Sequence, residues 1–223
     1  MANKNLIFER GTVMHHPSKI IDIIAGTAQL SGCAQINALS KASTLNSLNN
    51  DLDAARSQAV TMPVSDTATY DGIAIFGASN DTVGVALVGD ASMTADFDAA
   101  TISGTIDNFV GAENVTADEQ GNFSDLDGNP LSVTDLFLSV KSASGEVSVN
   151  NGTISGSTFS ADYASAVGIV MSGSPYHPHG TMAGDFIGSN ADMIEASANC
   201  DFTVNAACTD AVINEIDADE TGL

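Results

Sequence analysis

Apolar and polar residues alternate along most of the chain after residue 63. In residues 101–107 (TISGTID), Ile, Gly and Ile fall on one face while Thr, Ser, Thr and Asp fall on the other. This period of two is typical of a strand with one buried and one solvated face. The strands that the pattern predicts span residues 67–76, 82–88, 91–98, 101–109, 136–143, 146–150, 153–163, 166–172, 181–187 and 194–204.

Turn-forming residues separate these strands at short intervals, as in antiparallel barrels and sandwiches. Asn150-Asn151-Gly152 is a strong signal for a tight turn, and residues 110–130, rich in Asp, Glu, Gly and Asn, indicate a long exposed loop. Glycines inside the strands suggest the bends that a small closed barrel needs. We therefore expect an all-β fold, a small antiparallel β-barrel of about eight strands.

A helical pattern precedes the strands. Leu45, Leu48, Leu52, Ala55 and Ala59 recur at intervals of three and four within residues 35–60, which predicts an amphipathic helix. Such a stripe usually packs on its own domain, and a coiled-coil stalk is the alternative. The expected organisation is a leader at residues 1–33, a helical arm or linker at 34–60, the barrel at 61–205 and an acidic tail at 206–223.

Charge is distributed unevenly over the 223 residues. The 28 acidic and 6 basic residues give a formal net charge of -22, of which residues 1–56 contribute +1 and the remainder -23. A nucleic-acid partner is excluded because no basic patch can be assembled to neutralise phosphates. The acidic surface keeps the protein soluble, or alternatively provides a docking face for a cationic partner.

The three cysteines predict export. Cys200 and Cys208 lie close together, and a disulfide between them would close a short loop in an oxidising compartment. The third, Cys33, ends the sequence LSGC at residues 30–33, which resembles a bacterial lipobox. A cysteine in that motif becomes the lipidated N-terminus of the mature protein.

The segment before Cys33 fits a signal peptide in part. Residues 20–30 (IIDIIAGTAQL) supply an apolar stretch after Lys19, interrupted by Asp22 and Gln29, and Met14 is a start that gives the signal an ordinary length. The alternative is a soluble, partly helical arm over residues 1–33. No stretch of the sequence approaches the roughly 20 apolar residues of a membrane-spanning helix.

Several motifs in the strand region are similar to the β-barrel domain of transferrin-binding protein B. They are TATYDG at 67–72, MTADF at 93–97 followed by TISGTI at 101–106, GSTF at 156–159 and GDFIGSNA at 184–191. The sequence DMIEA at 192–196 departs from the Glu and Gly-Gly pair usual in that family. The resemblance implies an eight-stranded barrel carried on the bacterial outer surface by a lipidated cysteine. It does not imply transferrin binding, because the chain has room for one barrel, as in the family's single-barrel, solute-binding-like relatives.

The best candidate for ligand chemistry is a histidine pair in SPYHPHG at 174–180. Tyr176, His177 and His179 are side chains that ligate haem iron, and a His-x-His loop can hold zinc or copper. The alternative is a plain rigid turn with no cofactor. The sequence contains no nucleophile elbow and no glycine-rich phosphate loop, so we expect no enzyme.

We therefore interpret the chain as a non-enzymatic lipoprotein anchored through Cys33 in the bacterial outer membrane, exposed at the cell surface, or else secreted. Its expected partner is an iron source, another small ligand or a protein, bound by loops at one end of the barrel. Two alternatives remain open: a soluble haem or metal carrier using the histidine pair, and a coat or filament subunit with residues 1–60 as an assembly arm.

Overall fold

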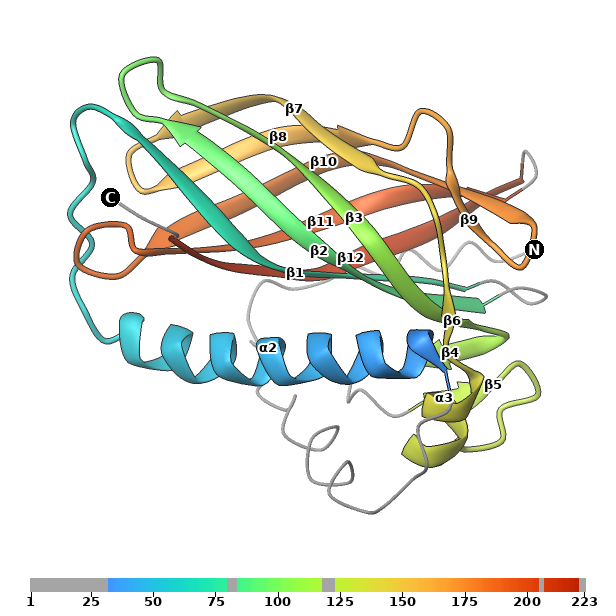
Figure 1. Cartoon of the computed structure of the whole chain (residues 1–223). Helices are drawn as coiled ribbons and strands as arrows, with labels where there is room; N and C mark the ends of the chain where they lie inside the picture. The colour runs from blue at the N-terminus through green and yellow to red at the C-terminus, as the bar shows by residue number, and fades with distance from the viewer. Residues whose placement is uncertain (1–31, 80–83, 118–122, 205–206, 221–223) are drawn as a thin grey trace, which may run out of the picture.

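An antiparallel sheet with one long helix on its outer face makes up most of the structure (Figure 1). The structure is a computed structural model, and it describes residues 32–79, 84–117, 123–204 and 207–220. The long helix is α2 (Cys33–Ala55). The main strands are β1 (Thr67–Ser79), β2 (Gly84–Asp96), β3 (Thr101–Glu113), β7 (Val147–Ser155), β8 (Thr158–Ala164), β10 (Ser174–Ile187), β11 (Met193–Val204) and β12 (Ala207–Glu220). A mainly β, antiparallel fold preceded by a helix is therefore confirmed.

Each of these strands pairs with its neighbours in the order β12-β1-β2-β3-β7-β8-β10. Strand β10 pairs with β8 along one edge and with β11 along the other, and β11 in turn pairs with β12. The sheet curls, so that its inner face encloses one apolar core (Figure 1). We refer to the buried side chains of that face as the main core. Its largest fully buried members are Tyr70, Phe76, Leu87, Met93, Ile102, Ile106, Phe109, Tyr163, Ile169 and Phe186.

Alternation along the strands builds the main core. In β8, Phe159, Ala161 and Tyr163 are buried, while the residues between them are exposed. Phe186 lies at the centre of an aromatic group, with ring centroids 5.5 Å from Phe159, 5.6 Å from Phe97 and 5.8 Å from Tyr70. Tilted and edge-on aromatic pairs at these distances stabilise a core beyond their buried area.

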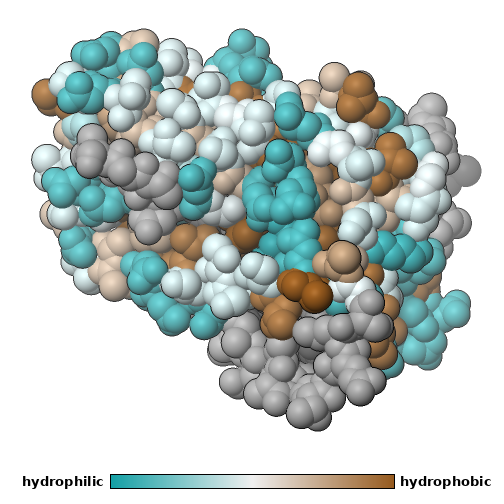
Figure 2. All heavy atoms as spheres, viewed as in Figure 1, coloured by the Kyte–Doolittle hydropathy of each residue, from teal (hydrophilic) through white to brown (hydrophobic). Residues whose placement is uncertain are grey.

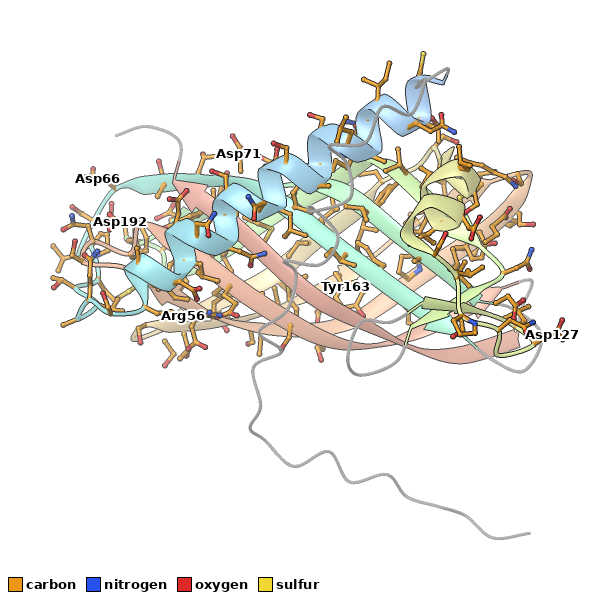
Figure 3. All side chains as sticks on the ribbon, turned by 90° about the horizontal axis from the view of Figure 1, so that it is seen from below. Arg56, Asp66, Asp71, Asp127, Tyr163 and Asp192 are labelled. Carbon is orange, nitrogen blue, oxygen red and sulfur yellow. The ribbon has the colours of Figure 1, made fainter. Side chains whose placement is uncertain are left out.

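Helix α2 lies along the outer face of the sheet (Figures 1 and 3). The predicted stripe is confirmed for Leu48, Leu52 and Ala55, which are buried, whereas Ala59 is exposed beyond the end of the helix. Their partners on the sheet complete a second apolar group, the helix cluster. It consists of Leu48, Leu52, Ala55, Ile73, Ile187 and Met193.

The two ends of the sheet differ. Short turns at residues 97–100, 156–157 and 188–192 form one end, which we call the turn end. The opposite end, the α3 end, carries the smaller elements (Figure 1). These are β4 (Val115–Ala117), β5 (Phe123–Asp125), α3 (Val133–Ser139), β6 (Lys141–Ser142) and β9 (Ile169–Met171).

Several predicted elements are wrong. Helix α3, at residues 133–139, overlaps the first half of the strand predicted at 136–143, and β3 together with the β4–β5 pair occupies much of the predicted loop at 110–130. Asn150-Asn151-Gly152 lies within β7 at a register shift, with Asn151 at φ +54, so it forms a bulge, not a hairpin turn. The turn falls at Gly156, with φ +61, and divides the strand predicted at 153–163.

The predicted acidic tail is also wrong for residues 207–220. They form β12, which pairs with β1 from Ala211 to Glu220 and with β11 from Ala207 to Asp219. The strands predicted at 82–88 and 91–98 are one strand, β2, which continues past a register shift opposite β3.

Candidate functional site

Cys33 is the first residue of α2, and its thiol is free and exposed. Gly32 before it is extended, with φ -129 and ψ 143. The nearby Gln35 donates a 3.4 Å hydrogen bond to the carbonyl of Val140, which places this start of the helix at the α3 end. Met14 and the rest of residues 1–31 lie outside the described residues, so cleavage of a leader remains a prediction.

Within the described residues, none of the helices is long and apolar enough to cross a membrane.

The histidine pair predicted as a loop lies instead in β10. Alternation along the strand buries Tyr176 and Pro178 on the inner face, whereas His177 is half-buried and His179 exposed on the other face. The structure therefore brings the two histidines to one side and separates them from Tyr176. Sequence reasoning missed this because a segment with two prolines indicates a turn more strongly than a strand.

Tyr176 belongs to a polar cluster at the α3 end. Its hydroxyl donates to Glu113 Oε1 at 3.1 Å, and Lys141 Nζ donates to Glu113 Oε2 at 3.0 Å and to Ser172 Oγ at 2.9 Å. Burial, together with the adjacent Glu113 carboxylate, raises the pKa of Tyr176 to about 12. Burial would raise the pKa of Glu113, but hydrogen bonds from Lys141, Ser172 and Tyr176 hold it below its ordinary value. The cluster ties β3, β6 and β10 together.

His177 and His179 have little around them that would complete a metal site. A Cβ placed on Gly168, where φ is +80, would lie 2.8 Å from His177 Cε1, so the imidazole packs directly on that glycine. His179 Nδ1 lies 3.2 Å from the carbonyl oxygen of His177. Among the described residues, no group of three or more His, Cys, Asp or Glu side chains is arranged to hold a metal ion.

An open groove of about 320 Å³ follows one side of α2 along the outer face of β1, β2 and β3. Asp71 lies beside the helix at this groove (Figure 3). The residues lining it are Thr44, Asp71, Gly72, Ile73, Asp90, Ala91, Ser92, Thr105 and Asp107. Its walls are therefore acidic and rich in hydroxyl groups. On the face that Figure 2 views, hydrophilic side chains are interspersed with neutral and apolar ones.

Lys41 of α2 pairs with Asp90, one of the residues that line this groove. Its side chain is only 3% exposed, and its ammonium forms an ion pair with Asp90. Sequence analysis did not single out this residue. The signal was present, because Lys41 stands four residues before Leu45 and so continues the stripe that faces the sheet.

Cys200 and Cys208 lie in the β11–β12 hairpin, and their side chains lie outside the described residues. Cys200 is opposite Ala211, and Cys208 is opposite Thr203, which is three residues from Cys200. Three residues of strand span about 10 Å, whereas a disulfide needs Cα atoms within about 7 Å. The predicted bridge therefore requires a different register for this hairpin.

Comparison with known proteins adds a distant likeness. No protein-family model and no curated protein matches the chain. Among solved structures, the chain is similar to intact Ap-TbpB, which has N and C lobes, with a TM-score of 0.42 and 16% sequence identity. The similarity covers 71% of this chain and 27% of that one, so the chain spans about a quarter of the length of Ap-TbpB. A similarity at this level assigns neither a family nor an activity.

Proposed function

We propose that this protein is a non-enzymatic β-barrel module, anchored by a lipid on Cys33 to the bacterial outer membrane, that binds a small ligand, an iron source or a protein partner at the cell surface. The observation that carries the proposal is the position of Cys33. The thiol is exposed, follows the lipobox-like LSG, and stands at the first residue of the helix that leads to the sheet. A modified residue there would not disturb either apolar cluster.

The barrel in this proposal consists of β1, β2, β3, β7, β8, β10, β11 and β12. Its support is that β10 pairs with β11 over residues Tyr176 to Ile187 while both strands keep a second neighbour. An eight-stranded barrel has an interior just wide enough for side chains to fill. The described inner-face side chains pack against one another as the main core, which favours a ligand site on the outside of the barrel or at one of its ends.

Anchoring through Cys33 would also orient the barrel. Helix α2 begins at the α3 end and finishes at the turn end, where Arg56 Nη2 lies 2.5 Å from Glu195 Oε1 of β11. Arg56, Asp66 and Asp192 all lie at that end, opposite Asp127 (Figure 3). A lipid on Cys33 therefore holds the α3 end near the membrane and directs the acidic turn end outward, which suits a cationic or small partner better than an anionic polymer.

The test is mass spectrometry of the full-length chain expressed in a Gram-negative host, with a Cys33→Ala variant as control. We expect a mature protein that begins at a lipidated Cys33 and partitions into the outer-membrane fraction. The Cys33→Ala variant should stay unlipidated and leave that fraction. An intact N-terminus with an unmodified Cys33 would overturn the proposal.

Hemin provides a direct test of the alternative haem carrier. Since Tyr176 lies on the opposite face from His177 and His179, the three side chains do not converge on one iron. We expect no Soret band on adding hemin. A band that disappears in the His177→Ala/His179→Ala double variant would instead establish the carrier.

The alternative of an assembly arm requires an apolar surface on residues 1–60 that is free to contact another subunit. Leu48 and Leu52 are buried against the protein's own sheet and are unavailable to a second subunit. Sedimentation of the native chain separates the two ideas, because an arm-driven assembly predicts large oligomers and an anchored module does not.

A further inference from the structure

The two halves of α2 are attached to the sheet by different chemistry. Between residues 45 and 55, Leu48, Leu52 and Ala55 are buried in the helix cluster. Between residues 33 and 44, Lys41 is the only buried side chain. The second half is thus attached by apolar burial, whereas the first depends on polar contacts.

Apart from the Gln35 contact with the Val140 carbonyl, those polar contacts converge on Asp90 of β2. Oδ1 of Asp90 pairs with Lys41, and Oδ2 accepts a 2.5 Å hydrogen bond from Asn108 Nδ2. The side-chain oxygen Oδ1 of Asn108 in turn accepts a 3.1 Å hydrogen bond from Asn37 Nδ2 on the helix. One carboxylate therefore connects the first half of α2 to β2 both directly and through β3.

A bulge in β3 positions Asn108 for its hydrogen bond to Asp90. The pairing of β2 with β3 shifts between Val88 and Asp90, and Asn108 adopts φ +50 at the extra position. The shift turns the Asn108 amide toward Asp90 and leaves Asp107 directly across from Asp90. Facing carboxylates repel each other, so the Lys41 ammonium also neutralises an unfavourable pair.

The start of the helix lacks capping interactions. The N-cap is Gly32, which offers no side-chain hydrogen bond, and the first turn has no acidic residue to interact with the helix dipole. A buried ammonium that loses its only carboxylate is strongly destabilising, because the charge stays desolvated without compensation. If this half of the helix leaves the sheet, the Lys41 ammonium returns to water and the desolvation cost is removed.

We propose that residues 33–44 form a releasable strap whose docking on the sheet is controlled by the Lys41–Asp90 pair. In the docked state the last strap residue, Thr44, lines the groove, and Cys33 stays at the α3 end. In the released state, twelve residues of extended chain reach about 40 Å. If Cys33 is anchored as proposed above, release lets the barrel stand farther from the membrane. The Lys41–Asp90 pair, which we call the latch, does not itself depend on the lipid.

Hydrogen–deuterium exchange on the unlipidated full-length chain tests the latch. In Asp90→Asn, we expect amides of residues 37–44 to exchange about tenfold faster or more, while those of residues 48–55 and of β1 to β3 keep native protection. Asp107→Asn is the matched control, since it removes the facing carboxylate on the neighbouring strand and leaves the Lys41 pair intact. It should show native exchange throughout.

A second variant separates the latch from a general loss of structure. Adding Lys41→Met to Asp90→Asn removes the buried charge as well as its partner, and an apolar side chain of similar size can remain docked without a carboxylate. We expect exchange over residues 37–44 to return to within about twofold of native. Unchanged exchange in Asp90→Asn, equal acceleration over residues 48–55, or failure of Lys41→Met to restore protection would each overturn the proposal. Because no lipid is involved, these outcomes are independent of the Cys33 test.

Discussion

The main core and the helix cluster are both apolar, but they stabilise different parts of the molecule. The main core contains large aromatic side chains from strands around the sheet, with Phe186 touching three other rings. The helix cluster joins three buried residues of α2 to three outward-facing residues of the sheet, with a few partly buried apolar side chains around them. Ion pairs from Lys41 and Arg56 supplement it.

The sheet has a core of its own on its inner face, whereas α2 covers only part of its outer face, so we expect the sheet to tolerate loss of the helix. β1 shows how the two clusters meet, because Tyr70 and Phe76 face the main core while Ile73 faces the helix. Loss of the helix would expose a small apolar patch on the sheet and leave the main core closed. Substitutions in the two clusters should therefore have separable effects.

The largest effect is expected for Phe186→Ala. Removing a fully buried aromatic ring costs about 3–5 kcal/mol, because transfer energy is lost and a cavity remains. Urea unfolding should show a lower midpoint for the whole sheet. Phe186→Leu, which keeps most of the volume, is the control and should lose less. A loss below about 1 kcal/mol for Phe186→Ala would mean that the aromatic group does not organise the core.

Leu52→Ala should cost about 2–4 kcal/mol, but only within α2. Leu52 is fully buried in the helix cluster, so its truncation should increase hydrogen exchange over residues 45–55 while the strands remain protected. Leu45→Ala, at a partly buried position of the same stripe, provides a milder control. Cooperative loss of the sheet in Leu52→Ala would show that the helix is integral to the fold.

A smaller loss, about 1 kcal/mol at neutral pH, is expected for Tyr176→Phe, which removes the hydrogen bond to Glu113. The native protein should also lose stability as pH rises from 10 to 12. The reason is that the unfolded phenol ionises near pH 10, whereas in the fold its pKa is raised to about 12. Thermal melts across this range should show a shallower alkaline decline for Tyr176→Phe. An unchanged slope would contradict the assignment.

The smallest effect, and one of opposite sign, is expected for Tyr163→Phe. The Tyr163 hydroxyl is buried on the inner face without a hydrogen-bond partner among the described residues. Deleting it should leave stability unchanged or raise it by about 1 kcal/mol. A loss comparable to that of Tyr176→Phe would indicate that the two inner-face tyrosines are equivalent.

Local patterns predicted the strands whose alternation is simple. Spacing alone predicted the strand at residues 101–107 and the helical stripe of Leu48 and Leu52, because side chains repeat every 2 residues in a strand and about every 3.6 residues in a helix. Asn150-Asn151-Gly152 and residues 133–139 were misinterpreted for one reason. A tight turn and a bulge use the same left-handed conformations, and a short apolar run is compatible with a helix or a strand.

The candidate site was less predictable than the fold. The motif at residues 174–180 placed Tyr176 beside two histidines, but the strand carries adjacent side chains to opposite faces. Lys41 was not singled out by the sequence. Its burial follows from a carboxylate 49 residues away that no local pattern connects to it.

Neighbouring residues alone predict a mainly β, acidic, antiparallel molecule with an amphipathic helix before the sheet and a lipobox-like cysteine just before that helix. The fold adds that residues 207–220 join the sheet, that Glu113 and Lys141 meet Tyr176, and that Asp90 pairs with Lys41. Each of these depends on which strands become neighbours, and that choice is made by long-range packing and hydrogen bonding.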